Sequence, residues 1–187
     1  IARGMFATDK MLKKAPIAFA RCGSISRGRY LTLIGGSVAS VEESFEEGLF
    51  WGGDGVLDSV FLADVHPQLH DAILGLRKPE GHGSIAIVET ATVSCNVRAA
   101  ELALKGTPVQ LMELRLADTG LSGKGLSIYQ GELHDVEAAM DIVHGFLTAT
   151  GREVMLQRVP QPLAKKSPSG TSIDGVSSSS HQARSTS

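Results

Sequence analysis

One segment of this sequence occurs twice. The run DKMLK followed by API, starting at Asp9, returns as ELALK followed by TPV, starting at Glu101, an offset of 92 residues. Further along, Val41-Glu42 returns as Val136-Glu137 at an offset of 95. The two offsets predict a duplicated unit of about 90 residues with a short insertion in the second copy. A period of this length indicates two small domains in tandem, and it favours pseudo-symmetry and assembly over a single active-site cleft.

The bulk composition is that of an ordinary globular protein. The chain has 187 residues, 42% hydrophobic, with a net charge of −2, which gives no electrostatic reason to bind nucleic acid or an anionic membrane. No apolar run is long enough to span a bilayer, and no signal peptide is visible. Two cysteines make no disulfide framework, which favours a reducing cytoplasm.

The second copy has the pattern of a β-α-β-β-α-β unit. Apolar spacing predicts strands at 84–89, 109–116, 126–129 and 154–159, helices at 93–105 and 133–147, and a Gly-rich turn at 118–125. This order is typical of an α+β fold in which a four-stranded antiparallel sheet carries two helices on one face.

The first copy follows the same path, except that its first strand is missing. We expect helices at 1–14 and 38–50 and strands at 17–22, 30–34 and 57–63. The counterpart of strand 84–89 falls before residue 1, so we expect about a dozen N-terminal residues to be absent from this sequence. The tail gives little support as a substitute strand. The predicted domains are 1–80 and 81–166, followed by a disordered Ser-rich tail, 167–187.

Several separated blocks resemble the tandem-domain shell proteins (BMC-T) of bacterial microcompartments. They occur in order between residues 1 and 163 and comprise Ile1-Ala2-Arg3-Gly4-Met5, Met11-Leu12-Lys13, the run from Asp58 to Pro67, Ile87-Val88-Glu89-Thr90 and Gly123-Lys124. Within this family, the blocks are most similar to the trimeric iron–sulfur type of the propanediol-utilisation compartment.

The resemblance implies a structural role and no enzymatic one. Three chains would form a pseudohexagonal tile that packs edge to edge with other shell proteins around enzymes, in a compartment of the bacterial cytoplasm. No nucleic-acid or membrane partner is expected. The family's edge lysine falls at Lys13 and Lys105. A long lysine side chain can lie along a neighbour's backbone and donate to its carbonyl groups.

The resemblance also implies a pore for small polar metabolites, lined by two loops, 22–29 and 118–124. The predicted lining residues are Gly23, Ser24, Ile25, Ser26, Arg27, Gly28, Thr119, Gly120, Leu121, Ser122 and Gly123. Small residues allow the close backbone approach that such a lining needs. A threefold ring of Arg27 would favour anions. The alternative is that the loops are two hairpin turns without a transport role.

The iron–sulfur relatives hold their cluster with one cysteine per chain, and Ser26 occupies that position here. A hydroxyl is a poor replacement for a thiolate, so we predict no cluster and no bound metal. Cys22, four residues earlier, is the outside candidate for a ligand but is expected to be a buried structural residue, as is Cys95. The alternative function is a redox or ligand-binding shell module that holds a metal, a cluster or a small anion on the trimer axis.

Overall fold

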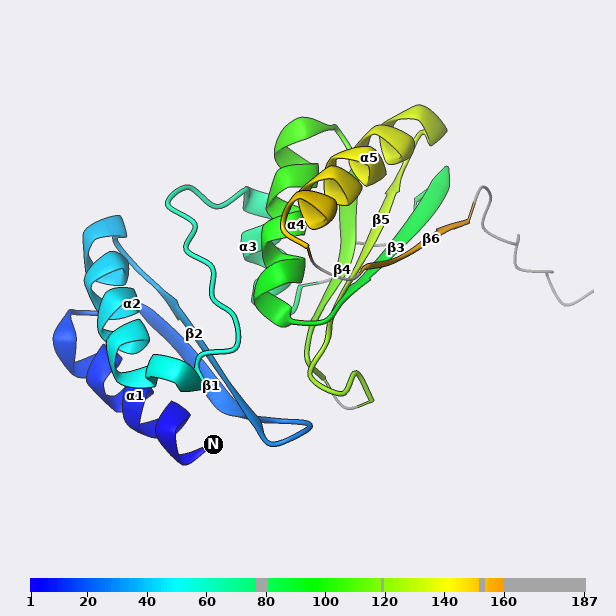
Figure 1. Ribbon diagram of the computed structural model, residues 1–187. Helices are drawn as coiled ribbons and strands as arrows, with labels where there is room; N and C mark the ends of the chain where they lie inside the picture. The colour runs from blue at the N-terminus through cyan, green and yellow to red at the C-terminus, as the bar shows by residue number, and fades with distance from the viewer. Residues whose placement is uncertain (77–80, 119, 152–153, 160–187) are drawn as a thin grey trace, which may run out of the picture.

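The computed structural model describes residues 1–76, 81–118, 120–151 and 154–159. The chain forms two units joined by an extended segment (Figure 1). The first unit contains α1 (Ala2–Lys14), β1 (Phe19–Ile25), β2 (Arg29–Gly35), α2 (Val38–Gly52) and the short 3-10 helix η1 (Gly53–Gly55). Helix α3 (Pro67–Ile73) precedes the second unit, which contains β3 (Ser84–Thr90), α4 (Val93–Gly106), β4 (Gln110–Leu116), β5 (Gly125–Gly131), α5 (Leu133–Ala149) and β6 (Val154–Val159).

The second unit has the predicted β-α-β-β-α-β order. Its sheet has the strand order β4-β5-β3-β6, and every neighbouring pair is antiparallel. Helices α4 and α5 pack together over one face of the sheet (Figure 1). Alternate residues of β3 are buried, among them Ala86 and Val88, because successive side chains of a strand point to opposite faces. The prediction of an α+β unit with helices on one face is confirmed.

The first unit has only part of this sheet among its described residues. Strands β1 and β2 form a two-stranded antiparallel sheet, and α1 packs against α2 and β2. The predicted fourth strand at 57–63 is wrong, since residues 56–62 are extended but belong to no sheet. The second unit gives the reason: β6 pairs only with β3, and the described first unit has no counterpart of β3. Without that neighbour, residues 57–63 have no adjacent strand with which to form backbone hydrogen bonds.

Strand β1 runs further than its sequence predicts. Pairing with β2 continues as far as Ile25 opposite Arg29, so residues 22–25 belong to the strand and only residues 26–28 form the loop. The prediction that Cys22 is buried is also wrong, because its side chain is exposed on β1 of the two-stranded sheet. Cys95 is 2% exposed in the core of the second unit, as predicted.

Helix α3 joins the two units by packing on the second. It begins at Pro67, and the Nδ1 atom of its N-cap residue His66 accepts the Gln68 N–H at 3.2 Å. Leu69 is fully buried in the core of the second unit, and the Gln68 side chain accepts the Leu111 N–H at 3.0 Å. The predicted domain boundary at residue 80 and the tail 167–187 lie outside the described residues. No helix in the described part of the chain is long and apolar enough to cross a membrane.

Tyr129 provides a stability test of this core. It is fully buried, which raises the pKa of its hydroxyl, and that hydroxyl accepts a hydrogen bond from Ser127 at 2.9 Å. The unfolded chain ionises at this residue near pH 10, whereas the folded chain stays protonated, so stability falls as the pH rises above about 10. We expect Tyr129→Phe to cost about 1 kcal/mol at pH 7. The difference from the unsubstituted chain should shrink by pH 11 in urea unfolding, and a constant difference would contradict the assignment.

Candidate functional site: two hairpin tips and the seam behind them

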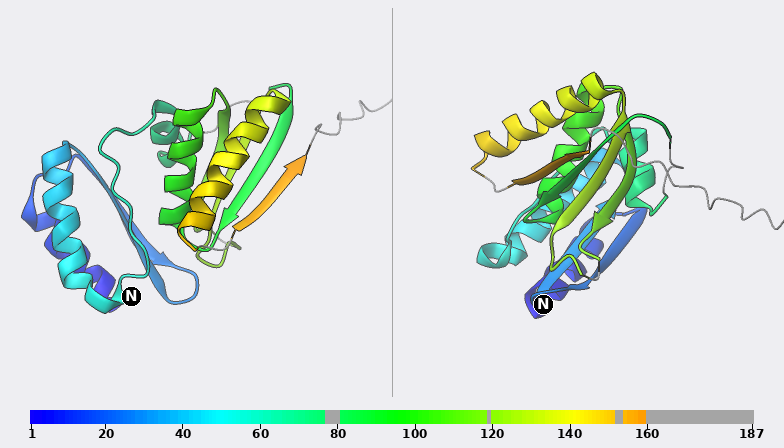
Figure 2. Two further views of the ribbon diagram at one scale, coloured as in Figure 1. Left: turned by 45° about the horizontal axis from the view of Figure 1, so that its top comes forward. Right: turned by 90° about the vertical axis from the view of Figure 1, so that its right-hand side faces the viewer.

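The loops predicted to line a pore lie together at one end of the molecule. The first loop, residues 26–28, joins β1 to β2, and the second, residues 117–124, joins β4 to β5 (Figures 1 and 2). A Cβ atom added to Gly123 would lie 3.4 Å from the Ser26 carbonyl oxygen and 3.3 Å from the Arg29 side chain. Because Gly123 also has a φ of +81°, a side chain there would be strained and crowded. The hairpins of the two copies therefore touch within one chain.

The tip of the first hairpin has a constrained backbone. Arg27 and Gly28 have φ values of 65° and 69°, in the left-handed region. For a non-glycine residue this conformation costs on the order of 1 kcal/mol, and the paired strands on either side hold it in place. Arg27 is exposed. The fold thus places a cationic side chain at the extreme end of the hairpin.

Most other charges near the tips are already paired. The Lys124 ammonium lies 2.5 Å from a Glu89 carboxylate oxygen, and Arg115 Nε lies 3.2 Å from Asp118. Arg29 donates to the Ala91 carbonyl of the other unit at 3.3 Å. Arg27 forms no ion pair with the described residues, so the tip region has an excess of positive charge.

The predicted lining residues differ in how well they fit that role. Those that are exposed at the tips are Ser26, Arg27, Gly28, Gly120 and Ser122. Leu121 is half-buried and Gly123 is buried. Gly23, Ser24 and Ile25 lie within β1, where Ile25 packs against the core of the second unit. Thr119 lies outside the described residues.

A seam of polar contacts holds the linker, residues 56–66 between η1 and α3, against α4. Lys105 Nζ donates to the Asp64 carbonyl at 2.5 Å and lies 2.8 Å from Glu101, which is 2% exposed. Glu101 also accepts the His66 N–H, at 3.1 Å for its nearer oxygen. The hydrogen bond that Lys105 donates to the Glu101 carboxylate raises the pKa of Lys105. At the other end of the helix, the N-cap residue Thr92 donates to the Asp58 carboxylate.

Glu101 was not among the predicted site residues, although it lies at the centre of this seam. The available signal was its position four residues before Lys105, a spacing that puts both side chains on one helix face. Lys105 makes the kind of contact expected of an edge lysine, but to a carbonyl of its own chain. Its place at a tile edge, like that of Lys13, stays a prediction.

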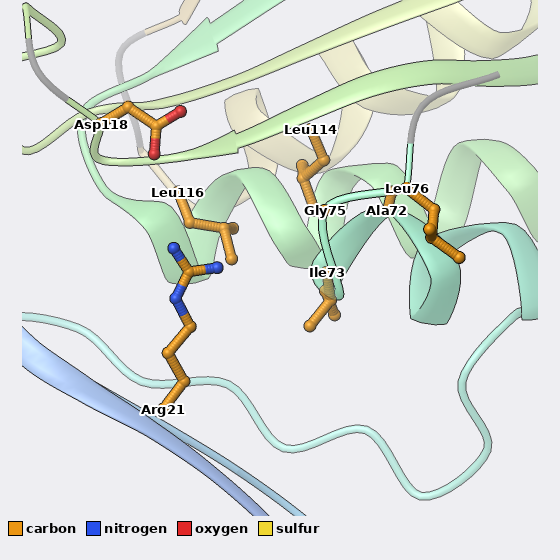
Figure 3. Close-up of a pocket in the computed structure, with 8 residues that line it drawn as sticks. All are labelled: Arg21, Ala72, Ile73, Gly75, Leu76, Leu114, Leu116 and Asp118. Atoms are coloured by element: carbon orange, nitrogen blue, oxygen red, sulfur yellow. The ribbon is translucent and has the colours of Figure 1, made fainter. Parts of the chain in front are cut away.

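A small pocket of about 110 Å³ lies between the two units, behind the hairpins (Figure 3). Its walls are mainly apolar side chains from α3 and β4, and Arg21 from β1 reaches across it toward Leu116 and Asp118. The volume is well below the roughly 300–1,000 Å³ of ordinary ligand sites. We interpret it as a packing gap in the seam between the units.

The donor atoms at the tips do not fit an iron–sulfur cluster. Ser26 is exposed at the end of the hairpin and offers a hydroxyl where the cluster needs a thiolate. Cys22 is set back within β1, and its hydrogen bond to Tyr30 raises the pKa of that phenol. Within the described residues, no three side chains of His, Cys, Asp or Glu come together as a metal site. The absence of a cluster stays a prediction.

Comparison with protein families gives a match in both units. The family model described as BMC domain matches residues 1–65 and 84–160. The chain is similar to the bacterial microcompartment shell protein PduT of Citrobacter freundii, with 32% identity over 162 residues that cover 87% of this chain and 88% of the relative.

Solved structures give the same result. A microcompartment protein from Desulfitobacterium hafniense DCB is similar with a TM-score of 0.77 and 31% identity, over 87% of this chain and 90% of that one. A double-ringed trimeric shell protein of the RMM microcompartment has a TM-score of 0.53 at 20% identity, over 78% and 76% of the two chains, which is a likeness of fold alone.

Proposed function

This chain belongs to the BMC-domain family and is a structural shell protein of bacterial microcompartments, and we propose that three copies close into one pseudohexagonal tile with a central pore. The observation that carries the proposal is the contact between the two hairpins. Ser26 of one unit and Gly123 of the next meet at the same end of the chain, as neighbouring lining loops of a ring would.

The two units of one chain supply the repeating contact of such a ring. The first unit presents its linker and β2 side, and the second presents α4 and β4, so the contact is head to tail. Head-to-tail contacts generate a closed ring when the rotation between neighbours is right. Six units at equal rotations need three chains, which is the architecture we propose.

The proposed activity is selective passage rather than catalysis. The tips expose small polar groups, and each chain contributes Arg27, an exposed cation that forms no ion pair with the described residues. Three such side chains around a narrow opening favour anions and polar solutes that can accept hydrogen bonds. We place the tile in the shell of a cytoplasmic compartment, next to other shell proteins and the enclosed enzymes. The alternative redox module has no support from the donor set at the tips.

Charge reversal at the tip tests the pore. We expect tiles carrying Arg27→Glu to change from anion preference to cation preference, seen as a change in the sign of the reversal potential across reconstituted tiles under a salt gradient. Arg98→Glu is the matched control, because Arg98 is exposed on α4 and lies away from the tips. An unchanged potential in the Arg27 variant would contradict the placement of this side chain in the pore.

Oligomeric mass and sheet formation test the tile itself. We expect sedimentation equilibrium to give three chains per particle, and electron microscopy to show extended hexagonal sheets. A monomer or a dimer at high concentration would contradict the proposed ring. Trimers that never form sheets would contradict the role as a shell tile.

A further inference from the structure

The helices of the first unit carry three exposed aromatic side chains in mutual contact: Phe6 on α1, and Phe50 and Trp51 on α2. The Phe6 and Trp51 rings meet edge to face with their centroids 5.3 Å apart, and the Phe50 and Trp51 rings do so at 5.2 Å. Their exposed fractions are 47% for Phe6, 75% for Phe50 and 38% for Trp51. Grouped apolar side chains on a surface mark interaction sites, and aromatic residues are enriched in protein interfaces. We call these three rings the aromatic patch.

The fold itself does not require the aromatic patch, as the second unit shows. At the offset of 92, Phe6 corresponds to Arg98 on α4, and at the offset of 95, Phe50 corresponds to Gly145 on α5. Both counterparts are exposed. The same pair of helices thus forms with a charged residue and a glycine at these positions. Phe6 and Phe50 therefore serve the surface of the first unit and not its core.

Polar contacts hold the rings of the patch in place. The Trp51 indole N–H donates to the Glu47 carboxylate at 2.7 Å. The Lys10 ammonium lies 5.1 Å from the centroid of the Phe6 ring and 5.2 Å from that of Trp51. Because these contacts already fix the side chains, less rotamer entropy is lost when a partner covers them. The patch is preorganised for binding.

The two helices carry opposite charges beside the patch. On α1, Arg3 lies three residues before the aromatic residue of that helix and Lys10 four residues after it, so all three share one helix face. On α2, Glu43 and Glu46 lie seven and four residues before the exposed phenylalanine, again on one face. Arg3, Glu43 and Glu46 are exposed and Lys10 is half-buried. The surface is therefore basic along α1, acidic along α2 and aromatic between them.

We infer that the aromatic patch binds the same patch of a second copy of the chain in a two-fold contact. Helices α1 and α2 pack side by side (Figure 1). A two-fold axis parallel to them lays α1 of each copy over α2 of the other, as an isologous interface requires. The rings then meet at the centre, and each basic face meets an acidic one. A partner with a single sign of charge would match only one of the two helices, whereas a second copy matches both.

This contact is separate from the proposed ring. Helices α1 and α2 lie on the side of the first unit that faces away from the second unit (Figure 1 and the left view of Figure 2). The hairpins join the units within one tile, and the aromatic patch joins chains of two tiles. A tile of three chains carries three patches, so their combined binding exceeds that of one contact. The inference itself holds for any number of chains in a tile.

Charge reversal on one helix at a time tests the pairing. The basic variant, Glu43→Lys with Glu46→Lys, is positive on both helices, and the acidic variant, Arg3→Glu with Lys10→Glu, is negative on both. Each variant repels a second copy of itself, but the two complement each other. With one variant immobilised and the other injected in surface plasmon resonance, we expect the mixed pair to bind at least about tenfold more tightly than either variant binds itself.

Removal of one ring separates the patch from attraction between net charges. We expect Phe50→Ala, introduced into both variants, to weaken the mixed pair by at least about tenfold, because a two-fold contact loses the ring twice. Leu133→Ala is the matched control and should have no effect, since Leu133 is 51% exposed on α5 of the second unit. Circular dichroism should show every variant folded. Equal binding in all pairings, or a mixed pair that tolerates Phe50→Ala, would overturn the inference and leave the patch to a partner of another kind.

Discussion

Gly125→Ala is expected to destabilise the second unit by about 3 kcal/mol, since overpacking a well-packed site commonly costs up to this amount. Gly125 begins β5 beneath the N-terminal turn of α4 and is buried. A Cβ atom there would lie 2.5 Å from the Asn96 Cβ and 3.1 Å from the Thr92 carbonyl oxygen. Neither atom is the end of a flexible side chain, so the helix and the strand have to move apart.

The same change should disturb the loop that joins β4 to β5. Asn96 is fully buried and donates to the Val88 carbonyl at 3.2 Å, so a displaced helix also strains β3. Gly125 pairs with Leu116 at the base of the second hairpin. Urea unfolding at a fixed protein concentration measures the loss, because an assembling protein's stability depends on concentration.

Gly145→Ala provides the matched control with the opposite expected sign. Gly145 lies within α5, and an added Cβ would meet nothing within 4 Å. Alanine favours a helix over glycine by about 0.5–1 kcal/mol, so this variant should be more stable than the unsubstituted chain. If both substitutions changed the free energy of unfolding in the same direction, the packing described for Gly125 would be wrong.

Removal of the half-exposed Lys105 is expected to destabilise the seam more than neutralisation of the buried Glu101. Lys105→Met leaves a carboxylate that is 2% exposed without its cation, and a buried unpaired charge is costly. Glu101→Gln keeps an oxygen for the His66 N–H, and the Lys105 side chain, 45% exposed, can turn to water. That second change should cost about 1 kcal/mol, the size of one ordinary hydrogen bond.

The double variant tests whether the cost of Lys105→Met comes from the unpaired Glu101 carboxylate. Lys105→Met with Glu101→Gln should be more stable than Lys105→Met alone, because the stranded charge is gone. Thermal unfolding at one protein concentration gives all four values of a double-mutant cycle. Equal losses for the two single variants would mean that Glu101 is hydrated in solution and that the seam is looser than the distances indicate.

The second copy could be read from its sequence because each local signal agreed with the fold. The helix 133–147 and the strands at 84–89 and 154–159 match α5, β3 and β6 to within two residues. Apolar periodicity specifies such elements when one face of each packs against a core. The resemblance to shell proteins was also confirmed, because its blocks lie on both of the units that the family model matches.

The errors occurred where pairing between distant segments decides the outcome. Residues 57–63 have the composition of a strand, but a strand needs a neighbour, and only the sheet order shows which neighbour that is. Cys22 packs as an apolar residue in a strand pattern, yet its exposure depends on whether another segment covers its face of the two-stranded sheet. Neither property is encoded within a short window of residues.

By itself, the sequence determined the duplication, the unit repeated and the family, because these depend on order and spacing along the chain. Only the tertiary structure decided that the two hairpins touch at Gly123, and that Glu101 and Lys105 hold the linker. It also left Asp9 and Lys13 uncovered at the equivalent place. The physical reason is that burial and hydrogen-bond partners depend on which surfaces meet, and two copies of similar sequence meet different neighbours in one chain.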